Sequence, residues 1–444
     1  MLDETLFLRY FMDFPPASSG LLVLFGKTDP GFVFLLFLRH IGILSTHMQS
    51  GKTNLPDFEN SEVAFRNQSN GDLRRAYHLF RVVNSKELVW LGKSLLHISF
   101  ALHLPVKGFI RNTLYRHFVG GESIDDCSKT ICRLAGGNVQ SILDYALEGE
   151  DSEEVFDATC EEVIRTIEFA GHNRNVPFSA FKITGLARFD LLEKVSAGDP
   201  LTVGDTAAFS RVKERVEAIF RRGYELDVPV LIDAEETWIQ PVLDELVLCC
   251  MAKYNRQRAI VQNTYQMYRR DSIARVWQHH RLAQEGGFRL GLKIVRGAYM
   301  EKERARAAEW GYPSPIQPDK AATDRDFDEI IRYLMEHSET IDFMVATHNE
   351  ASTLLLASLI DAAGLARNHR GIFFSQLYGM SDHLTYNLAE MGYNVAKYVP
   401  YGEVRTVMPY LLRRAEENSS VKGQSSRELK MIRKEIRRRS KVMH

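Results

Sequence analysis

The sequence predicts an α/β fold, a (β/α)8 barrel with additional helices before it. Short β-rich or apolar runs alternate with longer amphipathic stretches through most of the chain. Eight such strand-then-helix units fit within residues 141–418, which is typical of a closed barrel. Several of the runs end in a polar or charged residue, as barrel strands do where they form an active site. An open, doubly wound sheet is the alternative.

Length and composition exclude several classes of protein. A chain of 444 residues is long for one domain but suits a barrel with extra helices. The net charge of -1 gives no field that would attract nucleic acid, so no nucleic-acid partner is predicted. Five cysteines without a C-x-x-C pair argue for a reducing compartment, and neither a disulfide framework nor a metal site is predicted. No Rossmann or P-loop glycine motif occurs.

The amino-terminal part precedes the repeating units. Residues 1–47 differ from the rest of the chain, and we expect a dispensable or disordered extension, with a membrane-touching segment as the alternative. The apolar run 31–38 is too short to span a bilayer. Asp3 and Glu4 argue against a signal or transit peptide, which favours a bacterial protein. Apolar residues at helical spacing then predict an amino-terminal helical region over residues 48–138.

The barrel itself is predicted over residues 139–420. Its strands are expected, in order, at 141–145, 178–184, 228–233, 259–262, 289–296, 341–347, 371–376 and 393–398, where apolar and β-branched residues cluster. Its helices are expected at 151–172, 205–225, 237–254, 268–284, 318–337, 350–364, 380–391 and 403–418, where the apolar spacing becomes helical. Residues 421–444 form a basic helical tail, for which we expect solvation, with contact to an anionic membrane as the alternative.

Polar residues at the strand ends predict where the active site lies. Barrel enzymes assemble their sites at the carboxyl-terminal rim of the strands. The residues in question are Lys182, Asp233, Gln262, Arg296, Thr347, His348, Gln376 and Tyr398. We therefore expect these side chains to lie close together at one end of the barrel.

Two adjacent arginines, Arg413 and Arg414, follow Tyr410 on the last barrel helix. Successive helix positions lie about 100° apart, so the pair cannot share one solvated face. A guanidinium presents a planar fork of donors, and two of them can grip a carboxylate. The pair predicts a site for a small anion, with a basic surface patch as the alternative.

Five motifs in chain order resemble those of the proline dehydrogenases, and the likeness extends over about residues 139–420. The motifs are Leu-Ile-Asp233-Ala-Glu235, Lys293-Ile-Val-Arg296-Gly297-Ala298-Tyr299, Ala346-Thr347-His348-Asn349, Tyr398-Val-Pro400-Tyr401-Gly402 and Tyr410-Leu-Leu-Arg413-Arg414. This family uses FAD on a distorted (β/α)8 barrel. The resemblance implies oxidation of L-proline to Δ1-pyrroline-5-carboxylate by hydride transfer to the flavin, the first step of proline degradation to glutamate. It also implies electron transfer to membrane quinone, peripheral membrane contact, and a separate pyrroline-5-carboxylate dehydrogenase that takes the product.

The resemblance also implies roles for individual residues. Lys182, Arg413 and Arg414 would clamp the proline carboxylate, and Tyr398 and Tyr410 would wall the ring. Asp233 and Lys293 would be the catalytic residues, with Asp233 holding Lys182 or Tyr398 in place. Tyr299 and Leu377 would add to the substrate shell. The implied FAD contacts are Gln262, Lys293, Arg296, Gly297, Ala298, Thr347, His348, Gln376 and Glu417.

One motif departs from part of the family. Bacterial bifunctional relatives carry Arg and then Lys at the positions of Lys293 and Arg296, whereas this chain has the order of mitochondrial-type members. The sequence does not decide which of the two cations lies nearest flavin N5. Two residues three apart on a strand face opposite ways, so Arg296 must lie beyond the strand if both touch FAD. The alternative is that one of them is a surface residue.

Other functions compete with proline oxidation. A hydroxyproline dehydrogenase of the same superfamily is the closest rival, but that branch has a small polar residue where this chain has Tyr398. A Schiff-base aldolase would use Lys182 as its nucleophile, and a non-catalytic binding barrel is a third alternative. The expected location is the bacterial cytoplasm, peripheral to the inner membrane, or the mitochondrial inner membrane in a eukaryote.

Overall fold

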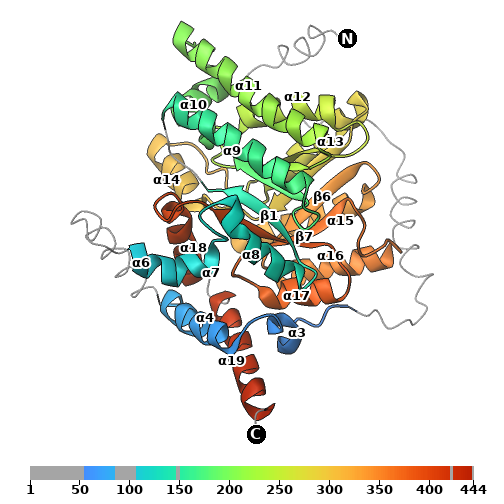
Figure 1. The fold of residues 1–444 in the computed structure, drawn as a ribbon. Helices are drawn as coiled ribbons and strands as arrows, with labels where there is room; N and C mark the ends of the chain where they lie inside the picture. Colours follow the sequence, from blue (N-terminus) through green and yellow to red (C-terminus); the bar gives the residue numbers. More distant parts are fainter. Residues whose placement is uncertain (1–54, 86–106, 147–150, 421–423, 443–444) are drawn as a thin grey trace, which may run out of the picture. The chain divides into compact units, whose positions relative to one another are not determined.

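The computed structural model describes residues 55–85, 107–146, 151–420 and 424–442. The predicted extension 1–47 and its boundary with the helical region lie outside the described residues. The strands form one closed barrel in the middle of the surrounding helices (Figure 1). Each strand pairs in parallel with the next, and β8 pairs with β1. The predicted (β/α)8 barrel is confirmed, and the open-sheet alternative is wrong. The strands are β1 (Gln140–Tyr145), β2 (Phe178–Lys182), β3 (Val230–Asp233), β4 (Val261–Gln266), β5 (Leu290–Val295), β6 (Ile341–Ala346), β7 (Ile372–Leu377) and β8 (Val395–Tyr401).

Side-chain alternation along the strands explains why the barrel has both a packed interior and a polar rim. An apolar layer formed by Ile142, Ala180, Leu231 and Ala396 fills the interior. Residues two positions further along a strand point the same way. The polar or aromatic residues that follow this layer are Asp144, Lys182, Asp233 and Tyr398. The strands therefore bring these four side chains to one rim of the barrel.

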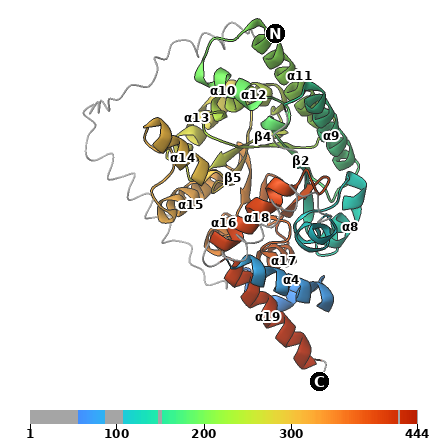
Figure 2. The ribbon, with the colours of Figure 1, turned by 90° about the vertical axis from the view of Figure 1, so that its left-hand side faces the viewer.

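Most helices form a ring around the strands (Figure 2). After β1 to β7 come α9 (Glu153–Gly171), α11 (Val203–Glu225), α12 (Gln240–Tyr254), α13 (Ser272–Gly286), α15 (Lys320–Glu336), α16 (Glu350–Ala362) and α17 (Asp382–Glu390). Local sequence defines their ends, as where Thr202 and Asp205 form a capping box at the start of α11. Two shorter helices, α10 (Phe189–Ala197) and α14 (Met300–Trp310), were not predicted. In α14 only Glu303 and Ala307 are buried, so its apolar pattern is weak.

The predicted bounds of the fourth strand are wrong. Strand β4 begins at Val261 and continues to Gln266, whereas residues 259–262 were expected. Its side chains are all buried although most of them are polar. Asn263 donates to Asp244 over 2.8 Å, and Thr264 donates to the carbonyl of Ile232 over 2.7 Å. Hydrogen bonds thus satisfy the polar side chains of β4. The prediction ended this strand too early because it relied on apolar residues.

The last two helices do not belong to the outer ring of helices around the strands. Helix α18 (Met408–Ser420) lies within the circle of outer helices in Figure 2. Its Tyr410 and Leu411 pack with Ala146, which follows β1, and with Met380, which follows β7. Helix α18 therefore covers the carboxyl-terminal end of the barrel, whereas residues 403–418 were expected as the eighth helix of the barrel.

The carboxyl-terminal helix α19 (Gln424–Val442) packs against α3 (Ser61–Phe65) and α4 (Asn70–Val83). Its Leu429, Met431 and Ile432 are buried there. The expectation of a solvated tail is therefore wrong, because one face of the helix belongs to the folded body. The remaining amino-terminal elements are α6 (Lys107–Ile110), η1 (Arg111–Tyr115), α7 (Arg116–Phe118) and α8 (Ile124–Ala135). Within the described ranges, no helix has the length and hydropathy needed to cross a membrane.

Candidate functional site

Asp233 is the centre of a polar cluster at the carboxyl-terminal rim. Lys182 at the end of β2 places its Nζ 3.0 Å from Oδ2 of Asp233, and the ammonium of Lys293 on β5 contacts Oδ1. Tyr398 of β8 donates its hydroxyl to Oδ2 over 2.8 Å. Four strands thus bring together four of the predicted residues.

The side chains of this cluster differ in charge and in pKa. Burial by itself raises the pKa of Asp233, but the Lys182 and Lys293 charges and hydrogen bonds outweigh burial and hold that pKa well below its ordinary value. Burial raises the pKa of Tyr398 well above its ordinary value, and the carboxylates of Asp144 and Asp233 add to this effect. The cluster therefore combines an ionised carboxylate and a protonated phenol with the side chains of Lys182 and Lys293. The two lysines can offer charge-assisted hydrogen bonds to an anionic ligand.

Aromatic rings and α18 enclose the same region. The Nζ of Lys293 lies 4.7 Å from the centre of the Tyr398 ring, within cation–π range. On α18, the guanidinium of Arg414 lies 5.2 Å from the centre of the buried Tyr410 ring. Arg414 is only 8% exposed and Arg413 is half-buried. The alternative prediction of a basic surface patch is therefore wrong for Arg414.

Tyr299 and Leu377, the two further shell residues, are both half-buried. Leu377 is the last residue of β7 and packs beside the interior layer of the barrel. Tyr299 follows β5 and lies immediately before α14, with the Lys302 ammonium 5.7 Å from its ring centre. Both positions belong to the rim where the polar cluster lies.

Arg296 points away from the Asp233 cluster. It follows the last residue of β5, as expected for a residue beyond the strand. Its Nη1 donates 2.6 Å to Oγ1 of Thr347, and its Nε donates 2.8 Å to Asp324. Its guanidinium carbon lies 4.2 Å from the ring centre of Phe327. Lys293 is buried and Arg296 is half-buried, so the alternative that one of them is a surface residue is wrong.

The residues after Arg296 expose backbone at the rim. Gly297 has a φ of +137°, and a Cβ there would lie 2.5 Å from the ring of Tyr268. Only glycine fits both constraints. The next amide, of Ala298, donates to Oε1 of Gln266 over 3.1 Å. Gly297 and Ala298 are both exposed, in the turn that follows β5.

Thr347, His348 and Gln376 lie together after β6 and on β7. Nδ1 of His348 lies 2.9 Å from Oγ of Ser381, and Gln376 donates to the carbonyl of Thr347 over 3.3 Å. Burial, with the nearby charges of Lys397 and Arg414, lowers the pKa of His348 well below its ordinary value. The imidazole is therefore neutral. The side chain of Glu417 lies outside the described residues.

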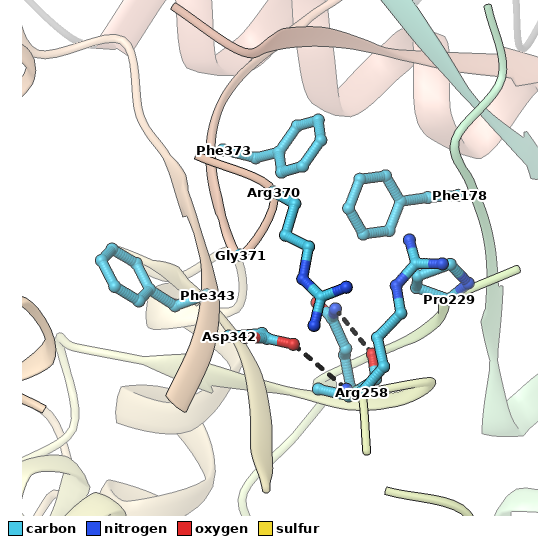
Figure 3. Close-up of a pocket in the computed structure, with 10 residues that line it drawn as sticks. Phe178, Pro229, Arg258, Asp342, Phe343, Arg370, Gly371 and Phe373 are labelled. Carbon is cyan, nitrogen blue, oxygen red and sulfur yellow. Dashed lines mark hydrogen bonds between the residues drawn. The ribbon is translucent and has the colours of Figure 1, made fainter. Parts of the chain in front are cut away.

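The structure moves Gln262 away from this rim. Gln262 pairs in register with Leu231, near the start of β4, and it donates to the carbonyl of Ala259 over 3.2 Å. It lines a small recess at the amino-terminal end of the barrel (Figure 3). The predicted strand-end position of Gln262 is wrong, because β4 continues for four residues beyond it.

Gln266 occupies the strand end in its place. Besides accepting from Ala298, it donates its Nε2 to the carbonyl of Glu235 over 2.8 Å. A pattern in the sequence could have indicated Gln266 as the strand-end residue. Gln262, Thr264 and Gln266 stand at every second position, as residues that face the interior of a barrel do.

Two acidic residues were also missed. Asp144 is buried near the end of β1 and acts electrostatically on Tyr398. Glu235 is buried after β3 and accepts from the hydroxyl of Thr184 over 2.7 Å. A carboxylate near the end of an apolar strand was the signal used for Asp233, and it applied equally to Asp144.

Comparison with known proteins assigns the family. The family model described as proline dehydrogenase matches residues 127–427, more than half of the chain. Proline dehydrogenase 1, mitochondrial, of Dictyostelium discoideum is 30% identical over 432 residues, covering 87% of this chain and 75% of that protein. A hydroxyproline dehydrogenase of Xenopus laevis is 29% identical over 413 residues, covering 84% of this chain and 88% of its own length.

A solved structure has the same fold. Proline utilization A of Bdellovibrio bacteriovorus, in a form inactivated by N-propargylglycine, superposes with a TM-score of 0.63 at 21% identity. The similar region covers 82% of this chain and 38% of that longer protein. At this identity the likeness supports the barrel alone. The family match and the Dictyostelium relative together show that the chain belongs to the proline dehydrogenase family of oxidoreductases.

Proposed function

We propose that this enzyme oxidises L-proline to Δ1-pyrroline-5-carboxylate with FAD as its cofactor. The observation that carries the proposal is the carboxylate of Asp233, which holds Lys182, Lys293 and Tyr398 at the carboxyl-terminal rim of the barrel. This arrangement supplies positive charge for the carboxylate of a small zwitterion and an aromatic wall for its ring. The family named after proline oxidation supports the same substrate.

Substrate binding follows from the charges. The proline carboxylate would lie among Lys182, Arg413 and Arg414, because charge-assisted hydrogen bonds to a guanidinium fork fix both position and orientation. Tyr398 and Tyr410 would pack against the ring. Holding C5 in one place supplies much of the barrier reduction in a transfer between two bound groups.

The rim residues fit a flavin cofactor in their chemistry. The exposed turn at Gly297 and Ala298, which the amide of Gln266 holds, and the neutral imidazole of His348 would face the cofactor together with two cations, Lys293 and Arg296. Bound FAD would accept the hydride removed from proline. The residues that would hold FAD are Gln266, Lys293, Arg296, Gly297, Ala298, Thr347, His348, Gln376 and Glu417.

Asp233 has a positioning task in this proposal. Its ionised carboxylate would hold the two ammonium groups and the phenol at fixed distances from the substrate. Lys293 contacts both Asp233 and the Tyr398 ring, so it would place a cation between substrate and flavin.

Two rival activities are less well supported. The ring of Tyr398 would fill the space that a hydroxyl on C4 of hydroxyproline needs, although a hydroxyproline dehydrogenase is among the relatives. A Schiff-base aldolase needs Lys182 as a neutral amine. The ion pair of 3.0 Å with Asp233 favours the charged ammonium instead.

Electron transfer and location are proposed from the family. Electrons would pass to a membrane quinone, and the enzyme would bind a membrane peripherally. That membrane would be the bacterial inner membrane or, in a eukaryote, the mitochondrial inner membrane; the Dictyostelium relative is named as mitochondrial. A separate pyrroline-5-carboxylate dehydrogenase would consume the product.

Anaerobic titration of the purified enzyme tests the proposal. L-Proline should bleach the flavin absorbance at a lower concentration than trans-4-hydroxy-L-proline does. A colourless protein would contradict the assignment of FAD, and preferential bleaching by hydroxyproline would reverse the choice of substrate.

A further inference from the structure

A chain of hydrogen bonds connects the carboxyl-terminal helix with the rim of the barrel. The carboxylate of Glu428, on α19, accepts the backbone N–H of Ser381. The hydroxyl of the same serine lies 2.9 Å from Nδ1 of His348. Glu428 is 3% exposed and Ser381 is 1% exposed, so water does not compete for these bonds. Within the described part of the chain, the other ring nitrogen of His348 makes no hydrogen bond.

Helix α19 is anchored firmly enough to hold Glu428 in place. Arg427 donates to Glu59 and to Glu350, both over 2.6 Å. Met431 is fully buried against α3 and α4. Arg439 donates to the carbonyl of Phe65 over 2.7 Å. Glu428 therefore projects from a fixed helix and not from a solvated tail.

The backbone of Ser381 needs such support. Its φ of +53° lies in the left-handed region, which a serine adopts at some energetic cost. The turn from β7 to α17 is held at further points: the buried ammonium of Lys397 contacts the carbonyl of Met380, and Nε2 of His117 lies 2.8 Å from the carbonyl of Gly379. The fold thus specifies the position of a single hydroxyl on this turn.

We infer that Glu428 is a positioning residue for the FAD site and acts on His348 through Ser381. Glu428 fixes the turn, the Ser381 hydroxyl fixes the orientation and tautomer of the neutral imidazole, and Nε2 of His348 is left for the cofactor. The inference rests on the proposed function, in which His348 contacts FAD. It gives the carboxyl-terminal helix a part in the site although none of the proposed FAD contacts lies on that helix.

Four variants distinguish this positioning role from a general effect on the stability of the protein. Ser381→Gly removes the hydroxyl and at the same time relieves the left-handed backbone. Glu428→Ala removes the acceptor, whereas Glu428→Gln keeps an oxygen in its place. Met431→Ala is the matched control, since it weakens the packing of α19 without touching the hydrogen-bond chain.

Release of flavin from the diluted holoenzyme is the first measurement. Ser381→Gly and Glu428→Ala should each release flavin about tenfold faster, as expected from the loss of one buried hydrogen bond. Glu428→Gln and Met431→Ala should stay near wild type. The double variant Ser381→Gly/Glu428→Ala should be no faster than the single ones, because both act through one route. Equal effects in Met431→Ala, or full additivity, would overturn the inference.

The ring nitrogens of His348 provide a second measurement that needs no flavin. In protein labelled with 15N-histidine, the His348 signals are assigned by their loss in His348→Gln. They should move in Ser381→Gly and in Glu428→Ala and stay in place in Met431→Ala. If Glu428→Ala does not fold, Ser381→Gly still decides the step from Ser381 to His348. Moved ring shifts in Glu428→Asp, whose carboxylate is drawn back by one methylene, then decide the step from Glu428. Unchanged chemical shifts of the His348 ring would refute the inferred connection from Glu428 through Ser381 to His348. A protein without flavin would refute only the proposed function.

Discussion

Tyr398 donates a 2.8 Å hydrogen bond to Asp233, which links the eighth strand of the barrel to the third. The same carboxylate holds Lys182 and Lys293. Removing one partner of a buried ion pair leaves the other charge uncompensated, and that is more harmful than the pair is stabilising. Asp233 therefore matters to the stability of the barrel as well as to its proposed chemistry.

Replacing Asp233 by Asn should lower the free energy of unfolding by about 3–5 kcal/mol at pH 7, since the buried Lys293 and the partly buried Lys182 lose their counter-charge. Urea denaturation measures this difference. The matched control is Asp227→Asn, which breaks the exposed pair with Arg258 and should change stability by less than about 1 kcal/mol. Equal effects in the two variants would show that burial of the Asp233 cluster does not matter.

Wild type and Asp233→Asn should also differ in how their free energy of unfolding depends on pH. The folded-state pKa of Asp233 is lowered from its ordinary value of 3.8. Its ionised form therefore stabilises the fold fully above about that pH, and this contribution is lost as the pH falls toward the folded-state pKa. The gap in unfolding free energy between wild type and Asp233→Asn should be constant near neutrality and shrink below pH 3.8. A gap that widens in acid would contradict this linkage.

Arg414→Met should raise the KM for proline by roughly 10–100-fold, because a charge-assisted contact contributes about 1.5–3 kcal/mol. Arg413→Met should have a smaller effect, since Arg413 is half-buried and Arg414 is buried. Arg405→Met, an exposed arginine shortly before α18, is the control and should leave the KM unchanged. Wild-type KM values in both α18 variants would remove the carboxylate clamp from the proposal.

Gly297→Ala should reduce the flavin content of the purified protein, because the new Cβ would meet the ring of Tyr268 as well as strain the backbone. Gly311→Ala is the control. Its φ of +72° gives the strain, but no atom lies within 4 Å of the added carbon. The flavin-to-protein absorbance ratio should fall in the first variant alone. A similar fall in both would attribute the effect to strain and not to the shape of the turn.

The sequence predicted the barrel because its strands are short, apolar and regularly followed by amphipathic helices. It did not predict where β4 ends, since Gln262, Asn263 and Thr264 are polar side chains buried by hydrogen bonds that only the fold supplies. For the same reason Gln262 was placed at the wrong end of the strand. Helix α19 was misjudged because its many charges conceal the apolar triplet of Leu429, Met431 and Ile432.

The site was predicted as a set of strand ends, and the structure brings Lys182, Asp233, Lys293 and Tyr398 into contact. The family resemblance implied that Asp233 holds Lys182 or Tyr398. The contact of Lys293 with Asp233 was not predicted, because it joins β5 to β3, which are not neighbouring strands. Contacts between distant segments, such as that of Glu428 with Ser381, leave no local pattern at all.

Tyr398→Ser should shift the preference of the enzyme from proline toward 4-hydroxyproline. Serine would leave space for a hydroxyl on C4 and offer it a hydrogen-bond partner, and one small group discriminates on the order of 10–200-fold. The measurement is the ratio of kcat/KM for the two substrates. Tyr398→Phe is the control: it loses the bond to Asp233 but keeps the ring, so its ratio should remain that of the wild type while its overall activity falls. An unchanged ratio in Tyr398→Ser would mean that this ring does not select the substrate, and the preference for proline would lose its structural basis.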